Sequence, residues 1–108
     1  MILVTGGLGY LGGRIVSYFI DSGQTVRIAS SRVKPEIPEQ FSSCEIVYIN
    51  FNDSITLENA CDKVSFVIHL AGLNAKESKE DAKAALFVNG LGTLKLLEAA
   101  EKKGVSRF

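Results

Sequence analysis

The sequence is poor in the residues that mark several classes of protein. It has no tryptophan, two prolines and two cysteines. Cys44 and Cys61 lack metal-ligand or redox spacing, which indicates reduced thiols of a cytoplasmic protein, and no metal site is expected. No apolar run approaches the roughly 20 residues that span a bilayer, and the start lacks the charged segment of a signal peptide.

Charge of either sign is not in excess. Twelve basic and twelve acidic residues leave no net charge, so nothing favours a nucleic acid or an anionic membrane as a partner. The composition, 46% hydrophobic and 22% charged, is that of an ordinary globular chain. Its 108 residues allow at most one domain, which is long enough to bury a core but short for a complete enzyme.

A strand, a glycine-rich turn and a helix follow one another at the start of the chain. The apolar run Ile2–Val4 predicts a buried strand of a parallel sheet. Apolar residues then recur at helical spacing and predict a helix over 10–22, which Gly23 ends. Glycines in this context are typical of a dinucleotide-binding loop.

The glycines fit two registers, Gly7-x-Gly9-x-x-Gly12 and Gly6-x-x-Gly9-x-x-Gly12. One glycine would allow the tight turn, one would leave room for a pyrophosphate, and the last would let helix and strand pack closely. The amides at the positive end of the helix, from about Tyr10, would then face the phosphates.

The rest of the chain continues to alternate strands with helices. Strands are predicted over 25–29, 44–49 and 63–70, and helices over 55–61 and 77–103. Asp53 or Ser54 would cap the shorter helix, and Val105–Phe108 would approach a fifth strand. This order predicts an α/β, Rossmann-like doubly wound parallel sheet with strand order 3-2-1-4 and helices on both faces.

Four ordered motifs give the chain a resemblance to the extended short-chain dehydrogenase/reductase family, which includes NAD(P)-dependent nucleotide-sugar epimerases and dehydratases. The motifs resemble the family's cofactor loop, its Asp-Leu pair, its His-Leu-Ala-(Ala/Gly) and its Asn-Val-x-Gly-Thr. The matching stretches are Thr5–Gly12, Asn50–Phe51, His69–Gly72 and Val88–Thr93, extended by Leu97–Ala100 and Gly104–Phe108.

The resemblance implies a set of residues around an NAD(P) cofactor. They are Gly6, Gly9, Tyr10, Leu11, Gly12, Ser30, Ser31, Arg32, Asn50, Phe51, Leu70, Ala71, Gly72 and Asn89. The family does not use the histidine at position 69 as its acid or base. For His69 we therefore expect a packing or loop-positioning role.

The end of the second strand bears on the choice between NADP and NAD. NAD-selective members carry an acidic residue there, which bonds the ribose 2′-hydroxyl. This chain has Ser30, Ser31 and Arg32 instead, and two hydroxyls with a guanidinium can hold a 2′-phosphate. The sequence therefore favours NADP, and NAD remains the alternative.

No catalytic residue is predicted in this chain. The family's Ser/Thr and its Tyr-x-x-x-Lys pair would lie beyond Phe108, and Tyr10, Tyr18 and Tyr48 have no lysine four residues later. We expect residues 1–108 to be the NAD(P)-binding N-terminal part of an enzyme whose catalytic and substrate-binding portion is absent. The complete enzyme would move hydride to or from a small-molecule substrate, most simply a nucleotide-linked sugar.

Two other functions remain open from the sequence. One is a non-catalytic NAD(P)-binding or redox-sensing module, and the other is a steroid- or flavonoid-type reductase of the same superfamily. An unpaired apolar sheet edge over 64–68 is also expected, and it would favour self-association, such as a homo-oligomer.

Overall fold

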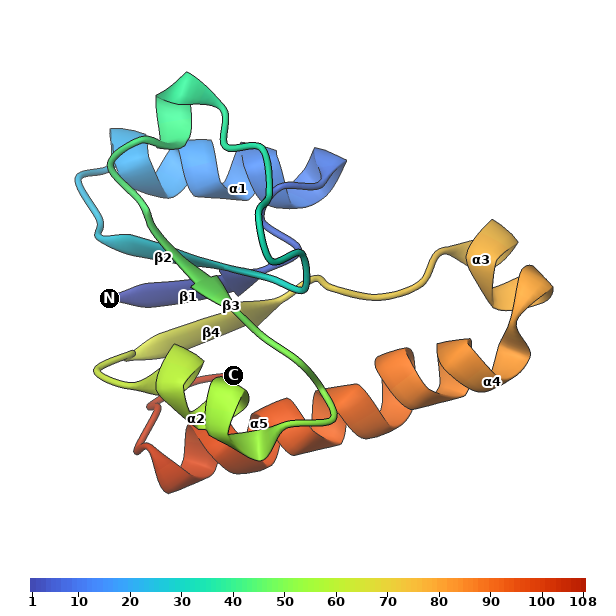
Figure 1. The fold of residues 1–108 in the computed structure, drawn as a ribbon. Helices are drawn as coiled ribbons and strands as arrows, with labels where there is room; N and C mark the ends of the chain where they lie inside the picture. Colours follow the sequence, from blue (N-terminus) through green and yellow to red (C-terminus); the bar gives the residue numbers. More distant parts are fainter.

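The computed structural model describes residues 1–108 and contains a four-stranded parallel sheet between helices (Figure 1). The sheet order is β3-β2-β1-β4, which confirms the predicted order and fold class. The strands are β1 (Ile2–Thr5), β2 (Val26–Ser30), β3 (Glu45–Tyr48) and β4 (Phe66–His69).

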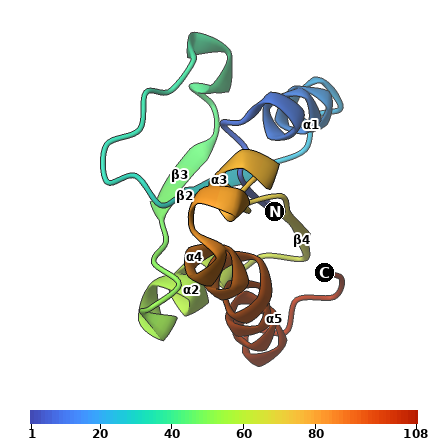
Figure 2. The same ribbon diagram turned by 90° about the vertical axis from the view of Figure 1, so that its right-hand side faces the viewer.

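Helices cover both faces of the sheet, as predicted. Helix α1 (Tyr10–Asp21) lies on one face, and α2 (Ser54–Cys61) and α5 (Thr93–Lys102) lie on the other (Figures 1 and 2). Leu3 of β1 belongs to the core under α2 and α5, whereas Val4 belongs to the core under α1. The first strand is apolar throughout because both of its faces are buried.

The ends of the first two helices follow local sequence signals. Gly23 stands just after α1 with φ +74°, and its amide donates to the carbonyl of Ile20 at 2.9 Å. Glycine adopts this left-handed conformation without the cost that a Cβ imposes. At the start of α2, the Asp53 carboxylate accepts from the amide of Ile55 at 3.0 Å, so Asp53 rather than Ser54 is the cap.

The buried Arg27 on β2 holds the far end of α2. Its Nη1 donates to the carbonyl oxygens of Ala60 and Asp62, each at 2.7 Å. Its Nη2 lies 3.0 Å from a carboxylate oxygen of Glu45 on the neighbouring β3. A guanidinium at the C-terminus of a helix satisfies free carbonyls and favours the negative end of the helix dipole.

The single helix predicted over 77–103 is wrong at Asp81, where the structure breaks it; from Ala82 to Lys102 the chain is continuously helical. The segment consists of α3 (Ala75–Glu80), α4 (Ala82–Ala85), the π-helical turn η2 (Leu86–Gly92) and α5. The break has a local cause, because Asp81 leaves helical geometry at φ −140° and its side chain caps the amide of Ala84. A short acidic side chain that bonds its own backbone competes with helix continuation.

The sheet edge at β4 is less open than expected. The amide of Val67 donates to the carbonyl of Arg107, and the amide of Ser106 donates to that of Ser65, both at 2.9 Å. Phe66 and Arg107 form a parallel bridge, so the last residues begin to pair with β4. The predicted unpaired edge over 64–68 is therefore wrong at residues 65–67. None of the helices is long and apolar enough to cross a bilayer.

Candidate functional site

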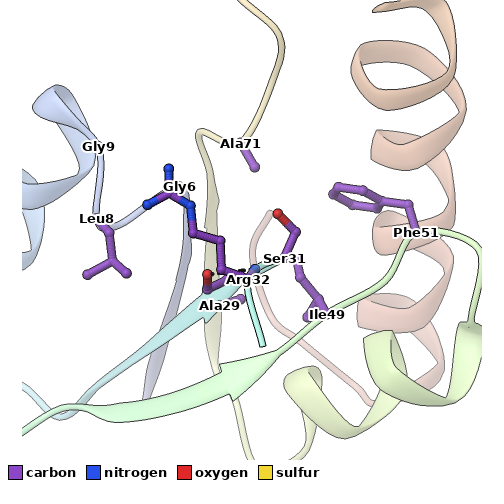
Figure 3. A pocket seen from close by; sticks show the side chains of 10 residues that line it. Gly6, Leu8, Gly9, Ala29, Ser31, Arg32, Ile49, Phe51 and Ala71 are labelled. Carbon is purple, nitrogen blue, oxygen red and sulfur yellow. Dashed lines mark hydrogen bonds between the residues drawn. The ribbon is translucent and has the colours of Figure 1, made fainter. Parts of the chain in front are cut away.

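A groove of about 200 Å³ opens at the carboxyl ends of β1, β2 and β3. In open α/β sheets the ligand crevice lies at this end of the strands. The groove's wall combines small, apolar and hydroxyl side chains with one guanidinium (Figure 3). The lining residues are Gly6, Leu8, Gly9, Ala29, Ser30, Ser31, Arg32, Ile49, Phe51 and Ala71.

Three glycines of the first loop meet at one backbone oxygen. The carbonyl oxygen of Gly6 would lie 2.1 Å from a Cβ on Gly12 and 3.2 Å from a Cβ on Gly9. Gly6 itself has φ +68°, and a Cβ there would stand 2.9 Å from the amide of Ala71. Gly7 is buried and faces Ile28 instead. The register that shapes the groove is therefore Gly6-x-x-Gly9-x-x-Gly12.

Helix α1 begins at this loop without a side-chain cap. Gly9 occupies the N-cap position in an extended conformation. The first backbone amides of the helix, on Tyr10, Leu11 and Gly12, have no carbonyl partner within the helix and suit an anion. The side chains of Tyr10 and Leu11 are exposed and do not line the groove, so these two residues can act there only through the backbone.

The end of β2 supplies the polar side of the groove. The hydroxyl of Ser30 accepts from the amide of Arg32 at 3.1 Å. The side chains of Ser31 and Arg32 rise from this end of β2 into the space between the glycine loop and Phe51 (Figure 3). Arg32 takes part in none of the three ion pairs of the chain, so its charge is available to an anionic ligand.

The end of β3 supplies an aromatic wall. Phe51 is buried in the core and presents its ring to the groove. Asn50 lies outside the groove lining, and its side-chain oxygen accepts from the amide of Asn52 at 2.9 Å. The amide side chain thus shapes the loop after β3, as Asx turns do.

The loop after β4 closes the floor. Ala71 lines the groove, while Leu70 lies with its backbone against Gly6. Asn89 accepts from the amide of Leu73 at 2.8 Å and donates to its carbonyl at 3.1 Å. A Cβ on Gly72 would stand 3.0 Å from the oxygen of Asn89. Leu70, Gly72 and Asn89 are thus placed to hold this loop.

Sequence reasoning missed Leu8, Ala29 and Ile49, which line the groove. Leu8 is one of the unspecified positions of Gly6-x-x-Gly9, and Ala29 and Ile49 lie outside the four motifs. Ala29 lies near the carboxyl end of β2 and Ile49 directly follows β3. The rule that ligands lie at strand ends would have found both.

The groove can bind a ligand, but it has none of the side chains that usually act as a general acid or base. No carboxylate, imidazole, lysine or tyrosine lines it. Burial raises the pKa of the Cys61 thiol to about 11 against the opposing effect of Arg27 and Lys103, and it also raises the pKa of Cys44. Neither thiol is therefore a ready nucleophile at neutral pH.

The residues fit one end of a dinucleotide. The glycine loop leaves room for a phosphate, because a Cβ on Gly9 would narrow the space in front of it. The free amides of α1 and the unpaired guanidinium of Arg32 are suited to bind the phosphate oxygens. The volume of about 200 Å³ is below the roughly 300–1,000 Å³ of pockets that enclose a drug-sized ligand. The groove therefore matches part of such a cofactor rather than the whole.

Comparison with known sequences gives a family match along nearly the whole chain. The model of the 3-beta hydroxysteroid dehydrogenase/isomerase family matches residues 3–108. A relative from Mycobacterium tuberculosis, described as 3 beta-hydroxysteroid dehydrogenase/Delta 5→4-isomerase, is 30% identical over 112 residues. The match covers 99% of this chain and 30% of that relative, so the chain spans about a third of the relative's length.

Solved structures match with the same coverage. A short-chain dehydrogenase/reductase superfamily protein from Agrobacterium tumefaciens with bound NAD is 34% identical, with a TM-score of 0.79, and the match covers 97% of this chain and 30% of that one. The UDP-glucose 4-epimerase of Thermus thermophilus, in complex with NAD, is 30% identical with a TM-score of 0.83. That match covers 96% of this chain and 34% of the epimerase.

Proposed function

This chain belongs to the 3-beta hydroxysteroid dehydrogenase/isomerase family, within the extended short-chain dehydrogenase/reductases, and on that basis we propose that it binds NAD(P) as the N-terminal part of an oxidoreductase, epimerase or dehydratase. The observation that carries the proposal is the glycine cradle. Gly6, Gly9 and Gly12 leave a surface on which a pyrophosphate can approach uncapped helix amides.

In this proposal some residues contact the cofactor directly, and others act by fixing the loops that carry those contacts. Gly9 and the amides from Tyr10 to Gly12 would receive the pyrophosphate, while Ser30–Arg32 would receive the adenosine ribose. Phe51 would lie against the adenine, and Ala71 would form the floor. Asn50, Leu70, Gly72 and Asn89 would act by shaping the loops that carry these contacts.

We propose NADP as the preferred cofactor. The free Arg32 guanidinium beside two serine hydroxyls supports a 2′-phosphate. The carboxyl end of β2 carries no acidic side chain that would repel that phosphate, since β2 ends in Ala29-Ser30 and is followed by Ser31-Arg32. The Agrobacterium and Thermus proteins were described with NAD. A preference of this chain for NADP over NAD would therefore depend on the Arg32 side chain, and substitution of Arg32 tests it.

A nicotinamide cofactor supplies hydride transfer at the C4 position of its ring. The residues of this chain would bind and orient it, because no carboxylate, imidazole, lysine or tyrosine lines the groove. We propose a nucleotide-linked sugar as the substrate class of the whole protein, which the epimerase neighbours support. A hydroxysteroid is the second candidate, and the Mycobacterium relative favours it.

We also propose that the protein forms a homo-oligomer through its last long helical segment. Leu86, Leu91, Leu94 and Leu97 are large apolar side chains of η2 and α5 that are all exposed. Exposed apolar side chains that follow one another along η2 and α5 are typical of an interaction surface. Light scattering coupled to size-exclusion chromatography would test it, with a monomer as the contrary result.

Calorimetric titration with NADP and with NAD tests the cofactor proposal. We expect tighter binding of NADP, and we expect Arg32→Ala to weaken NADP by about 1 to 3 kcal/mol while leaving NAD unchanged, since only NADP carries the 2′-phosphate. Lys34→Ala is the matched control, because Lys34 is an exposed cation of the same loop outside the groove.

The titration can also refute the proposal. Equal affinity for the two cofactors, or tighter binding of NAD, would overturn the preference for NADP. Equal losses of both cofactors in Arg32→Ala would assign Arg32 to the shared pyrophosphate instead.

A further inference from the structure

One chain of hydrogen bonds joins the groove to the π-helical turn. Thr5, the last residue of β1, is fully buried, and its Oγ1 lies 2.6 Å from Nδ1 of His69. Nε2 of the same ring lies 3.0 Å from Oγ1 of Thr93. Thr93 donates in turn to the carbonyl of Asn89 at 2.9 Å.

The protons of this chain can be assigned by counting donors and acceptors. The Thr5 hydroxyl accepts from the amides of Leu70 and Ala71, each at 3.1 Å, and the Leu70 amide is shared with the Thr5 carbonyl oxygen at 3.2 Å. A hydroxyl has two lone pairs and one hydrogen, so Thr5 has only its hydrogen left for His69. This count favours Nδ1 as the bare acceptor and Nε2 as the nitrogen that carries the ring proton.

The same count assigns the proton on the other side of the ring, between Nε2 of His69 and Oγ1 of Thr93. Thr93 uses its hydrogen on the Asn89 carbonyl, so it can only accept from His69. Each hydrogen in this series then has a single acceptor. A second proton on the ring would place two donors, Nδ1–H and the Thr5 hydroxyl hydrogen, opposite each other. Burial also favours the neutral ring, since it lowers the pKa of His69.

This series of hydrogen bonds connects the end of β1, beside the glycine loop, with the end of η2, which holds the loop after β4. Thr5 directly precedes Gly6 of the glycine loop. Thr93 directly follows η2, whose Asn89 grips the backbone of Leu73. The His69 ring also stacks edge-on near Phe51, at 6.1 Å between ring centroids, so it touches the aromatic wall as well.

We propose that His69 is a positioning residue of the dinucleotide site, locked as the Nε2–H tautomer between Thr5 and Thr93 so that the loop after β4 is fixed beneath the glycine loop. The proposal rests on the proposed function of the groove. It assigns no proton transfer to His69, which does not line the groove.

Nitrogen-15 NMR of histidine-labelled protein tests the tautomer without any substitution. The chain has one histidine, so the ring gives one pair of nitrogen resonances. We expect an unprotonated Nδ1 and a protonated Nε2 across the neutral pH range. The opposite tautomer, or the averaged shifts of a ring that exchanges freely between tautomers, would overturn the proposal.

Substitutions at Thr93 test the consequence for binding. Thr93→Val keeps the shape and removes the acceptor, and we expect NADP affinity to fall on the order of 10-fold. Thr93→Ser restores the hydroxyl and should restore affinity together with the Nε2–H resonance. Thr25→Val is the control, because Thr25 is an exposed threonine with no part in this chain.

The two proposals fail in different ways. If the unsubstituted protein binds neither NADP nor NAD, the proposed function fails although the tautomer can still be read. If it binds a dinucleotide and Thr93→Val binds it equally well, the groove stands and the positioning role of His69 is refuted.

Discussion

Gly12 is packed against Gly6 so closely that a Cβ on Gly12 would stand 2.1 Å from the Gly6 carbonyl oxygen. The same Cβ would lie 2.8 Å from the Cα of Gly7. Both obstacles are backbone atoms, which cannot swing aside as a side chain can. Gly9 differs, because its Cβ would meet only the Gly6 oxygen, at 3.2 Å. One motif therefore contains a glycine needed for packing and another that leaves a surface free.

Gly12→Ala should destabilise the fold. The methyl group would force the first turn of α1 away from the glycine loop, and overpacking of this kind costs about 1–3 kcal/mol or more. Urea unfolding of the variant measures the loss.

Gly13→Ala is the matched control for that experiment. Gly13 neighbours Gly12 in α1, but its Cβ would lie at ordinary contact distances of 3.7 Å from the Gly7 carbonyl oxygen and a ring carbon of Phe41. Alanine should stabilise the helix there by about 1 kcal/mol. Equal effects of the two substitutions would contradict the packing role of Gly12.

Arg27→Ala should cost more than Glu45→Gln, although the two side chains form an ion pair. The Arg27 side chain is 8% exposed and the Glu45 side chain is 50% exposed. Removal of Arg27 leaves the carbonyls of Ala60 and Asp62 without their donor, at a cost of about 1.5–3 kcal/mol. The exposed partner should contribute less than about 1 kcal/mol. Unfolding by urea compares them, and equal losses would contradict this division.

Stability should fall in mild acid through His69. Burial holds the pKa of the folded imidazole below its ordinary value of 6.5, so the unfolded chain binds the proton more tightly. The stability is fully present above 6.5 and is lost as pH falls toward the lowered folded pKa. Denaturant unfolding between about pH 7.5 and pH 5.5 measures this slope. His69→Gln should be less stable at neutral pH but flatter over that range, and an unchanged slope would refute the assignment.

The two cysteines should react in sequence with a thiol reagent. Cys44 is partly exposed, whereas Cys61 is buried and its pKa is raised to about 11. Because the thiolate is the reactive form, at about pH 8 Cys44 should be modified first and Cys61 only after denaturant is added. Modification of Cys61 in the native protein at the rate of Cys44 would show that the core beneath α2 opens readily.

Local patterns in the sequence were sufficient for the fold. The apolar Ile2–Val4 run, the glycines after it and Gly23 give the first strand, turn and helix within one or two residues of their observed bounds. These signals act over a few residues, so they survive whatever packs around them. The alternation of strands and helices then leaves few topologies, and the observed order is one of them.

The break in the helical segment and the long-range side-chain contacts could not be predicted from the sequence. Residues 77–103 have helical spacing, yet the side chain of Asp81 captures a nearby amide and starts a new helix. The contact of His69 with Thr93 joins residues 24 apart, and no local pattern announces it. Ser30–Arg32 line the groove, whereas the side chain of Asn50 accepts a hydrogen bond from the amide of Asn52 in its own loop. Side-chain competition of this kind is decided only by the folded backbone.

Titration of Gly9→Val with the preferred dinucleotide tests the central claim most directly. Gly9 has φ −85° and ψ 177°, an extended conformation open to any residue, but its Cβ would stand 3.2 Å from the backbone oxygen of Gly6. Some loss of stability is therefore expected, and urea unfolding of the variant must first show that it is folded under the conditions of the titration. Its side chain would occupy the surface where the pyrophosphate approaches. We expect the unsubstituted protein to bind the dinucleotide and Gly9→Val, still folded, not to bind it. Normal binding by the folded variant would contradict it.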